Sequence, residues 1–394
     1  MDVQKMDMNA VRAKYGDEIR GIARQMHMRP ELGLEEHETT AMIRKRMTQL
    51  GLEEIDLGLD TGAVFVLRSG KGGPSIGLRA DIDALTQTEQ SDRPDCSRIN
   101  GVMHACGHDV HTAGLIGAAM LLAEQKDKLC GDVVFLFQPA EETLRGAKLM
   151  IERGLFSRVH IDMLFGLHNS PRIPVGSVGV RLGNLMAAKD MYRARITGKG
   201  GHSSAPHRNI DPIIAACAAV QGVHSIISRN IDPLQSAVIS VGYLHGGNPE
   251  DMVVDEAEFS GSIRSHAAQS RKTVLERLEQ VVTGTALAYG CKSEFTSNSI
   301  VPAVDNPAEL YPIAQRAAAL IVGKENVVEP EVNMASEDFA LFARQAPGFF
   351  YFLGSGTPGA RNYGWHNPKF AADPETPIYG AALLAQSVLC AQSR

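Results

Sequence analysis

The chain has 394 residues, of which 44% are hydrophobic and 21% are charged, a composition that is typical of a folded globular protein and excludes a disordered chain. Lys and Arg number 39 and Asp and Glu number 45, so the net charge of −6 gives no general attraction to nucleic acid or to an anionic membrane. No apolar run reaches the roughly 18–20 residues that span a bilayer, and the N-terminal segment lacks a signal-peptide core, so we expect a cytoplasmic protein. The length of the chain predicts about two domains.

The first part of the chain alternates predicted helices with short buried strands. Helical apolar spacing predicts helices at 10–27, 36–50, 108–125 and 144–153. Apolar runs bounded by Gly, Pro or charged residues predict strands at 63–67, 75–78, 133–137 and 163–167. This alternation is typical of an α/β domain with a largely parallel central sheet.

The middle of the chain has a different order of elements. Its pattern predicts strands at 187–197, 236–244, 252–264 and 291–296, with helices at 210–229 and 268–288. The resulting β-α-β-β-α-β order is the ferredoxin-like arrangement. The α/β style then resumes, with helices predicted at 307–322, 336–345 and 376–391 and a strand at 348–353. We therefore expect a catalytic α/β domain made of 1–183 and 296–394, interrupted by an inserted α+β ferredoxin-like domain at 184–295.

A cysteine and a histidine two residues apart form the first candidate site. Cys106 and His108 stand in the segment 103–109, MHACGHD, and a thiolate and an imidazole at this spacing can bind one metal centre. A buried cysteine beside a polar helix cap is an alternative reading, and so is a Cys–His catalytic dyad, although the partners of such a dyad usually lie far apart in sequence.

Two adjacent acids follow a wholly apolar predicted strand. Glu141 and Glu142 come after the segment 135–139, FLFQP, and the carboxyl ends of strands in open α/β sheets are where sites form. A solvated acidic loop is the alternative. In a site, one acid can bind metal while its neighbour acts as a base.

Further candidate ligands also follow predicted strands or lie in a loop. Asp81 and Asp83 come after 75–78, His168 comes after 163–167, and His366 lies in a loop of Gly, Trp, Asn and Pro. Each is weak alone, but together they place thiolate, imidazole and carboxylate groups where they can converge, which favours a metal-assisted hydrolase. In the inserted domain, the Gly-rich segment at 198–207 carries His202, which is either an ordinary hairpin tip or a turn that brings an imidazole to a substrate.

The whole chain resembles the M20 family of metallopeptidases, in particular the N-acyl-amino-acid amidohydrolases that include hippurate and auxin-conjugate hydrolases. Eight ordered motifs carry the resemblance: HMRPEL at 27–32, LRADIDAL at 78–85, MHACGHD at 103–109, FQPAEE at 137–142, GGH at 200–202, HGG at 245–247, SEDF at 336–339 and WHNP at 365–368.

The resemblance implies a role for each matching residue. The ligands of a two-metal site would be Cys106, His108, Glu142, His168 and His366. Glu141 matches the general base, Asp83 an acid that supports the site, and His202 a lid histidine that helps to stabilise the oxyanion and can come from a partner subunit. The candidate substrate contacts are Arg264, which is similar to an arginine that holds a substrate carboxylate, together with Arg145, Asp251 and Gly246.

The same resemblance implies the reaction and its requirements. Two divalent metal ions, with zinc or manganese favoured and cobalt or nickel as alternatives, would activate a water that attacks an amide carbonyl, with Glu141 as the base. The inserted domain would serve as a lid and as the surface of a homodimer. The substrate would be a small molecule, and neither nucleic acid nor membrane is expected as a partner.

The sequence departs from the subgroup in places expected near the substrate. Thr86 replaces the usual proline, the turn after Glu142 is TLRG at 143–146, and the lid segment 251–255, DMVVD, lacks the usual amide and proline. The leading hypothesis is hydrolysis of the C–N bond of an N-acyl amino acid with an aromatic or aliphatic acyl group. The alternative is hydrolytic deamination of an amino-substituted aromatic acid at the same site. A third hypothesis, a non-enzymatic sensor, is disfavoured because a binding protein needs no base at Glu141.

Overall fold

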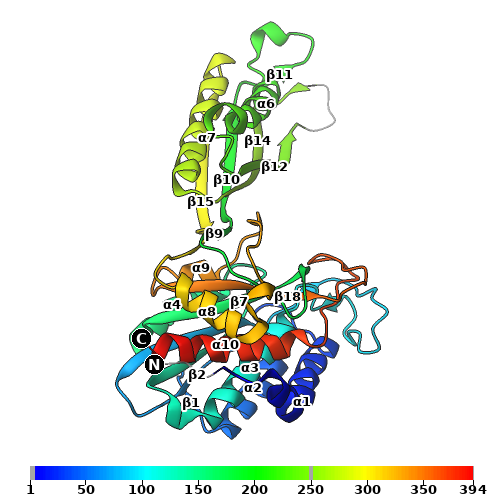
Figure 1. The fold of residues 1–394 in the computed structure, drawn as a ribbon. Coiled ribbons are helices and arrows are strands. Elements are labelled where there is room, and N and C mark those ends of the chain that lie inside the picture. Colours follow the sequence, from blue (N-terminus) through cyan, green and yellow to red (C-terminus); the bar gives the residue numbers. More distant parts are fainter. Residues whose placement is uncertain (1–4, 248–251, 394) are drawn as a thin grey trace. The chain divides into compact units, whose positions relative to one another are not determined.

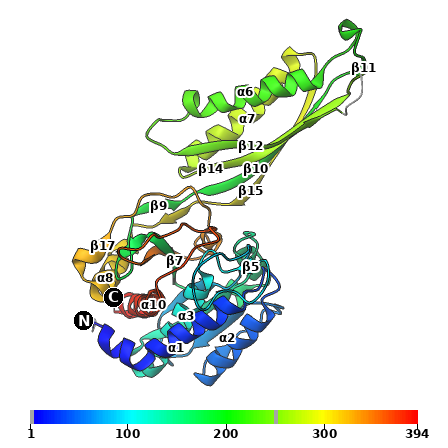
Figure 2. The same ribbon diagram turned by 90° about the vertical axis from the view of Figure 1, so that its right-hand side faces the viewer.

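The computed structural model describes residues 5–247 and 252–393, which divide into two compact units (Figure 1 and Figure 2). The larger unit is built from Met1–Gly183, Asp305–Glu331 and Asp338–Arg394. The inserted unit is built from Asn184–Val304 and Val332–Glu337. The strands β9 (Gly183–Met186) and β16 (Val304–Asn306) lie where the chain passes between the units.

A mixed sheet forms the centre of the larger unit. In spatial order its strands are β1 (Glu53–Glu54), β2 (Ala63–Leu67), β6 (Gly131–Gln138), β3 (Gly73–Asp81), β7 (Met163–Pro174), β18 (Gly348–Gly356), β8 (Val178–Gly179) and β17 (Val327–Val328). The four central strands, β6, β3, β7 and β18, are mutually parallel. At the edges, β1 and β2 pair antiparallel with their neighbours, and β8 pairs antiparallel with β18 and parallel with β17. The expected largely parallel sheet is therefore confirmed.

Helices cover both faces of this sheet. They are α1 (Met8–Met28), α2 (His37–Gln49), α3 (His108–Glu124), α4 (Gly146–Glu152), α5 (Leu155–Arg158), α8 (Tyr311–Val322), α9 (Phe339–Phe342) and α10 (Thr376–Gln392). Side chains alternate between faces along a strand. Phe349 and Tyr351 of β18 lie in the core shared with α3 and α10, whereas Phe350 packs against Phe339 of α9, with ring centroids 4.7 Å apart. Because α3 and α10 are buried on nearly all sides, apolar residues lie all around both helices, and the buried polar residues of α3 gather at its N-terminal end.

The inserted unit has the expected ferredoxin-like fold. Its elements in chain order are β10 (Ala188–Thr197), α6 (Pro212–Asn230), β12 (Ala237–Gly246), β14 (Glu256–Ser265), α7 (Ala268–Ala288) and β15 (Lys292–Val301), with a small pair formed by β11 (Gly201–His202) and β13 (Met252–Val253). The sheet order is β12-β14-β10-β15 and every pairing is antiparallel. Figure 2 shows α6 and α7 along one face of this sheet, so the buried residues of the strands alternate with exposed ones.

Three predicted elements differ from the structure. The strand expected at 291–296 continues to Val301 because it pairs with β10 along its length, so the expected domain boundary at 295 falls inside β15. The strand expected at 163–167 continues to Pro174 because β18 pairs with it beyond His168. The helix expected at 336–345 is a single turn. The side chain of Asp338 makes no cap hydrogen bond to it and accepts instead from the N–H of Ala147, and β18 begins directly after Pro347.

No helix in the described part of the chain is both long enough and apolar enough to cross a membrane.

Candidate metal centre

The expected ligands Cys106 and His108 lie at the start of α3, beside the ends of the central strands. Gly107 between them adopts a left-handed conformation with φ 84°, and a Cβ atom there would lie 2.4 Å from Nδ2 of Asn169. Glycine is the residue that tolerates both conditions. The tight turn lets Cys106 and His108 face the same space, which is the arrangement that the sequence spacing predicts.

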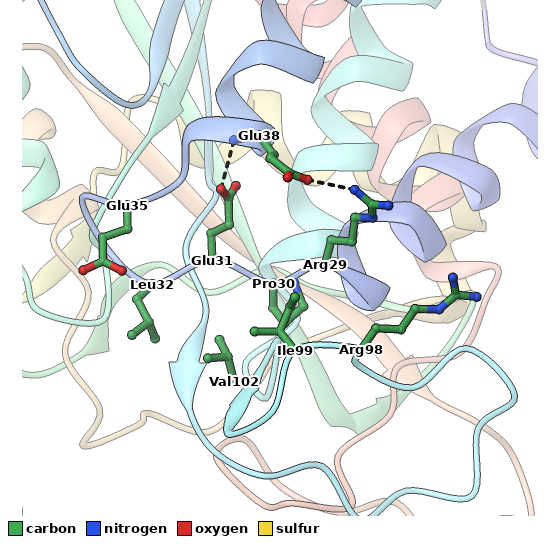
Figure 3. Close-up of a pocket in the computed structure, with 9 residues that line it drawn as sticks. All are labelled: Arg29, Pro30, Glu31, Leu32, Glu35, Glu38, Arg98, Ile99 and Val102. Atoms are coloured by element: carbon green, nitrogen blue, oxygen red, sulfur yellow. Dashed lines mark hydrogen bonds and ion pairs between the residues drawn. The ribbon is translucent and has the colours of Figure 1, made fainter.

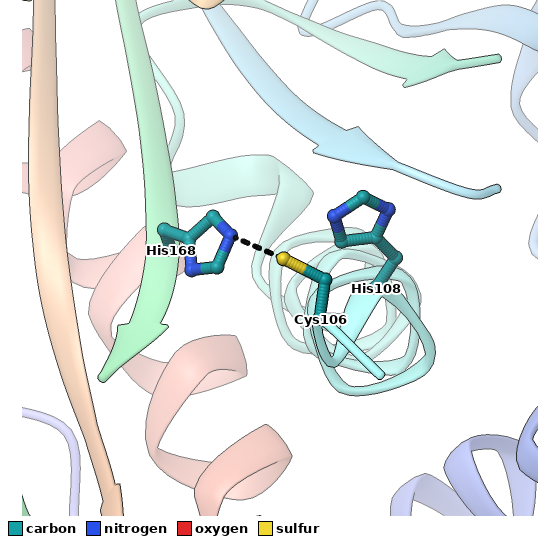
Figure 4. Close-up of side chains that lie close together, drawn as sticks. All are labelled: Cys106, His108 and His168. Carbon is teal, nitrogen blue, oxygen red and sulfur yellow. Dashed lines mark hydrogen bonds between the residues drawn. The ribbon is translucent and has the colours of Figure 1, made fainter. Parts of the chain in front are cut away.

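A thiol and two imidazoles form the first group of donors (Figure 4). Cys106 Sγ lies 3.3 Å from His168 Nε2, and the donor atoms of Cys106, His108 and His168 all lie within 4.8 Å of one another. His168 Nδ1 lies 2.8 Å from the carbonyl oxygen of Asn169, which can only accept, so Nδ1 carries the hydrogen and Nε2 offers a lone pair. His168 lies within β7, but β3 pairs with β7 only as far as Gly166, so the imidazole lies just beyond the end of that ladder.

Two acids and a third imidazole form the second group. His366 Nε2 lies 3.3 Å from Glu142 Oε2, and Cys106, Glu142 and His366 again have donor atoms within 4.8 Å of one another. His108 Nε2 lies 3.7 Å from Glu142 Oε1 and 4.0 Å from Glu141 Oε2. Cys106 belongs to both groups of three donors. The structure thus brings together all five expected ligands and Glu141.

Asp83 supports this cluster from behind, as the sequence analysis expects. Its two carboxylate oxygens lie 3.1 Å from His108 Nδ1 and 3.0 Å from the backbone nitrogen of Glu142. The side chain is fully buried. Because Asp83 accepts from Nδ1, the His108 Nε2 atom is left facing Glu141 and Glu142.

The electrostatics of the cluster fit a bound divalent cation. Burial and the carboxylates of Glu142 and Glu141 raise the pKa of the Cys106 thiol well above its ordinary value. Burial acts to lower the pKa of His108, but Asp81, Asp83 and Glu142 together raise it to about 10. The raised pKa of His108, and the carboxylate contribution to that of Cys106, report an excess of negative charge. A metal ligand set needs the opposite protonation states, a thiolate and a neutral imidazole.

Two buried polar atoms support the same conclusion. His108 Nε2 and Glu142 Oε1 have no hydrogen-bond partner within the described part of the chain, although both are removed from solvent. Unpaired buried polar atoms are costly and rare in folded proteins. A cation between them would satisfy both atoms and supply the missing positive charge, so the residues present fit a metal site.

A fourth histidine, His111, lies close to the cluster and is missed by the sequence analysis. Its Nε2 accepts the backbone N–H of Asn169 at 2.8 Å, so its hydrogen is on Nδ1, which donates to Asp81 at 2.6 Å. Because both ring nitrogens are engaged, His111 is a support rather than a ligand. Its position three residues after His108, on the same face of a helix, is the signal that could have revealed it.

Asn169 joins several of these groups. Its Nδ2 donates to the carbonyl oxygen of Cys106 at 2.6 Å, and its own carbonyl oxygen accepts from Trp365 Nε1 at 3.0 Å, next to His366. Asn169 is not predicted from the sequence, because a single asparagine after an apolar run forms no local pattern.

The remaining candidate residues belong to other parts of the chain. Arg145 is exposed, and its side chain makes no hydrogen bond or ion pair with the rest of the described chain.

In the inserted unit, Ser204 donates its backbone N–H to His202 Nδ1 at 3.1 Å, so the hydrogen of this exposed imidazole is on Nε2. Arg264 is half-buried and hydrogen-bonds Ser336, and burial lowers the pKa of its guanidinium. Gly246 ends β12, where a Cβ atom would lie 2.9 Å from Ile213. Asp251 lies outside the described residues.

A cavity of about 440 Å³ lies between the loop at 29–38 and residues 98–102 (Figure 3). Among the described residues, its lining includes none of the five expected ligands. It therefore shares no residue with the metal centre.

His27, the first residue of the motif at 27–32, belongs to a buried ion cluster. His27 Nδ1 lies 2.8 Å from Asp109, and its Nε2 lies 3.2 Å from Glu89. Burial acts to lower the pKa of His27, but the charge and hydrogen bond of Asp109 and the hydrogen bond of Glu89 raise it to about 9. A raised pKa means that the charged imidazole stabilises the fold below the ordinary pKa of 6.5, and that this stability is lost as the pH rises through about 9.

We expect His27→Gln to be most destabilising at low pH. The difference in unfolding free energy between the wild type and this variant should shrink by about 3 kcal/mol between pH 6.5 and pH 9.5. Urea unfolding at a series of pH values measures it. A difference that does not change with pH would contradict the assigned charge state of His27.

Comparisons with known proteins agree with this geometry. Residues 77–389 match peptidase family M20/M25/M40. The chain is 41% identical to an N-acetylcysteine deacetylase of Bacillus subtilis over 364 residues, which cover 92% of this chain and 94% of the relative. It is 36% identical to IAA-amino acid hydrolase ILR1-like 4 of Arabidopsis thaliana over 384 residues, 95% of this chain and 86% of the relative. A solved structure of a dinuclear metal binding peptidase from the M20 family of Bacillus subtilis is 34% identical, with a TM-score of 0.86 and coverage of 97% of this chain and 99% of that chain. The chain belongs to peptidase family M20/M25/M40.

Proposed function

We propose that this member of peptidase family M20/M25/M40 is a metal-dependent hydrolase that cleaves the amide C–N bond of an N-acyl amino acid. The observation that carries the proposal is the pairing of two adjacent acids with different surroundings. Glu142 lies against His366 and Cys106, as a ligand would, whereas Glu141 lies beside the same cluster within reach of His108 Nε2. The names of the two relatives, a deacetylase and an amino acid conjugate hydrolase, support an N-acyl amino acid as the substrate class.

Each residue of the cluster then has a task. Cys106, His108, Glu142, His168 and His366 would hold two divalent metal ions. When bound, such a pair lowers the pKa of a water from about 16 to about 7 and polarises a carbonyl oxygen. Glu141 accepts the proton of the attacking water at its carboxylate and passes it to the leaving nitrogen. Asp83 keeps the lone pair of His108 Nε2 directed at the site by accepting from Nδ1.

The inserted unit would complete the site. We assign to His202 Nε2–H the stabilisation of the oxyanion, and to Arg264 the binding of the substrate carboxylate, because no acid among the described residues pairs with this half-buried arginine. Gly246, Asp251 and Arg145 stay candidate substrate contacts. We further propose a homodimer through the inserted unit. Its strand β12 lies at the edge of the sheet and exposes Val238, Tyr243 and Leu244, and an exposed apolar sheet edge favours pairing with another chain.

We expect protein purified without chelator to contain more than one and up to two equivalents of divalent metal per chain. The mixed thiolate, imidazole and carboxylate ligands favour zinc, with manganese next and cobalt or nickel as substitutes. Elemental analysis measures the content, and titration of metal-free protein measures activity as a function of equivalents added. Full activity at a single equivalent, with no response to a second, would contradict a two-metal site.

The substrate class is tested with a panel of N-acyl amino acids and amino-substituted aromatic acids. Metal-loaded protein is incubated with each compound, and the products are identified by mass spectrometry. Release of a free amino acid and a carboxylic acid is the expected result. Release of ammonia without an amino acid would instead establish the aromatic deaminase, and no turnover of either class would remove the proposal.

A further inference from the structure

The turn that carries Glu141 and Glu142 has an unusual backbone. In an extended chain, adjacent side chains point to opposite sides, yet both of these carboxylates lie within 4.0 Å of the same atom, His108 Nε2. Residues with a left-handed backbone stand on either side of the two acids: Ala140 and Leu144 have φ values of 51° and 55°. A left-handed conformation costs a residue other than glycine roughly 1–2 kcal/mol, so the surrounding structure must hold the turn in place.

Two buried carboxylates from distant parts of the chain hold the backbone N–H groups of this turn. Asp83 accepts from the N–H of Glu142 at 3.0 Å, and Glu36 accepts from the N–H of Ala140 at 2.8 Å. The loop before α2 also packs tightly on the turn, because a Cβ atom at Gly33 would lie 3.0 Å from the Cα atom of Ala140. Glu36 therefore contacts the first left-handed residue of the turn.

Capping of α2 does not explain why the carboxylate of Glu36 is buried. Glu36 is the N-cap residue of α2, where a side chain usually accepts a hydrogen bond from the first turn, but its carboxylate makes no such bond. Glu31 does this instead, accepting from the N–H of Glu38 at 2.9 Å (Figure 3) and from the N–H of Thr39 at 2.8 Å. Glu36 is fully buried, and burial raises its pKa to about 6. Besides the N–H of Ala140, this carboxylate interacts with Thr61 and with its own backbone N–H. Burying a carboxyl group here costs stability without capping α2, and the contact with Ala140 is the one that reaches the turn of Glu141 and Glu142.

We propose that Glu36 is a positioning residue that holds Ala140 in its left-handed conformation and thereby aims Glu141 and Glu142 at the same site. It acts through the backbone and contacts neither substrate nor metal. The inference rests on the proposed function, because Glu141 and Glu142 matter only if they serve as base and ligand. It assigns Glu36 a role in hydrolysis and in metal retention.

The test uses two conservative variants with opposite properties. Glu36→Gln removes the charge but keeps an acceptor oxygen at the same reach, so kcat is expected to stay within about threefold of the wild type. Glu36→Asp keeps the charge but shortens the side chain and loses the hydrogen bond, so kcat is expected to fall about 10–100-fold with KM little changed, because a displacement of about 1 Å can cost about 10²-fold. Chelator titration should show weaker metal retention in Glu36→Asp only.

Two further variants separate positioning from general stability. The double variant Glu36→Asp with Ala140→Gly should have a kcat about tenfold higher than that of Glu36→Asp alone, because glycine adopts a positive φ without strain. The matched control is Glu31→Asp, which weakens the cap of α2 and should lower the melting temperature while leaving kcat and metal retention unchanged.

Several results would overturn the inference. They are a Glu36→Gln variant as impaired as Glu36→Asp, a Glu36→Asp variant with normal kcat and metal retention, or no recovery on adding Ala140→Gly. If the wild type hydrolyses no N-acyl amino acid, the proposed function fails by itself, and the chelator titration of the same variants still decides the role of Glu36.

Discussion

Glu141→Gln is expected to lower kcat by about 10²–10⁴-fold while the metal content stays at the wild-type value. Glutamine has nearly the same shape as glutamate but cannot accept a proton at neutral pH, and general-base catalysis contributes a factor of this size. Glu141 is 7% exposed and lies 4.0 Å from His108 Nε2, so the substitution leaves the packing of the site intact. Steady-state kinetics together with elemental analysis of the same preparation measure the effect.

The neighbouring acid provides the matched control. Glu142→Gln removes a group that lies 3.3 Å from His366 Nε2, and it should lower the metal content as well as the activity. The two variants differ by one position in the chain, so any general effect of replacing an acid in this turn is common to both. Near-normal turnover in Glu141→Gln, or loss of metal from both variants, would contradict the division of roles between base and ligand.

The chemistry of the site is predictable from the sequence because each donor belongs to a short local pattern. Cys106 and His108 stand two residues apart at a helix start, and Glu141 and Glu142 follow an apolar strand. Parallel strands end at the same edge of a sheet, so local patterns at several strand ends predict convergence without any knowledge of long-range contacts. The ferredoxin-like order of the inserted unit is predictable for a similar reason, because β10 and β14 alternate clearly between buried and more exposed residues.

The groups that support the site cannot be predicted in this way. Arg79 is fully buried and bonds Asp81, two residues away, and Asp338, which is 259 residues away. Asp338 in turn accepts the backbone N–H of Ala147 at the start of α4. A buried charged network of this kind is stable only when all its partners are present. The partners come from separate elements, so a local pattern does not identify them.

The length of β7 also depends on a partner from a distant part of the chain. Its apolar run ends at Leu167, and polar residues follow, which predicts the end of a strand. The strand continues because β18 supplies backbone partners as far as Pro174. The backbone hydrogen bonds to β18 extend the strand beyond the point at which the polar residues predict its end. His168 and Asn169 therefore lie in a strand rather than in a loop. Rigid support of this kind favours precise placement of ligands.

His202→Ala is expected to lower kcat by about 10²–10³-fold with unchanged metal content. Loss of one oxyanion donor typically has an effect of this size. His202 Nδ1 accepts from Ser204, which leaves Nε2–H as a donor for a ligand. Because His202 belongs to the inserted unit and every expected ligand belongs to the larger unit, removal of the imidazole should leave the metal ions in place. Steady-state kinetics with metal analysis measure this, and normal kcat would exclude His202 from the reaction.

Mixing two inactive variants then decides which subunit supplies His202. Suppose that His202 serves the site of the partner in a homodimer. A mixed dimer with Glu141→Gln on one chain and His202→Ala on the other has one site with both defects and one site with neither, so activity returns on mixing. If His202 serves its own chain, each site keeps one defect and mixing restores nothing. Subunit exchange must be demonstrated first, for example with chains of different mass. Exchange without recovered activity would assign His202 to its own chain and would remove the reason for requiring a dimer in catalysis.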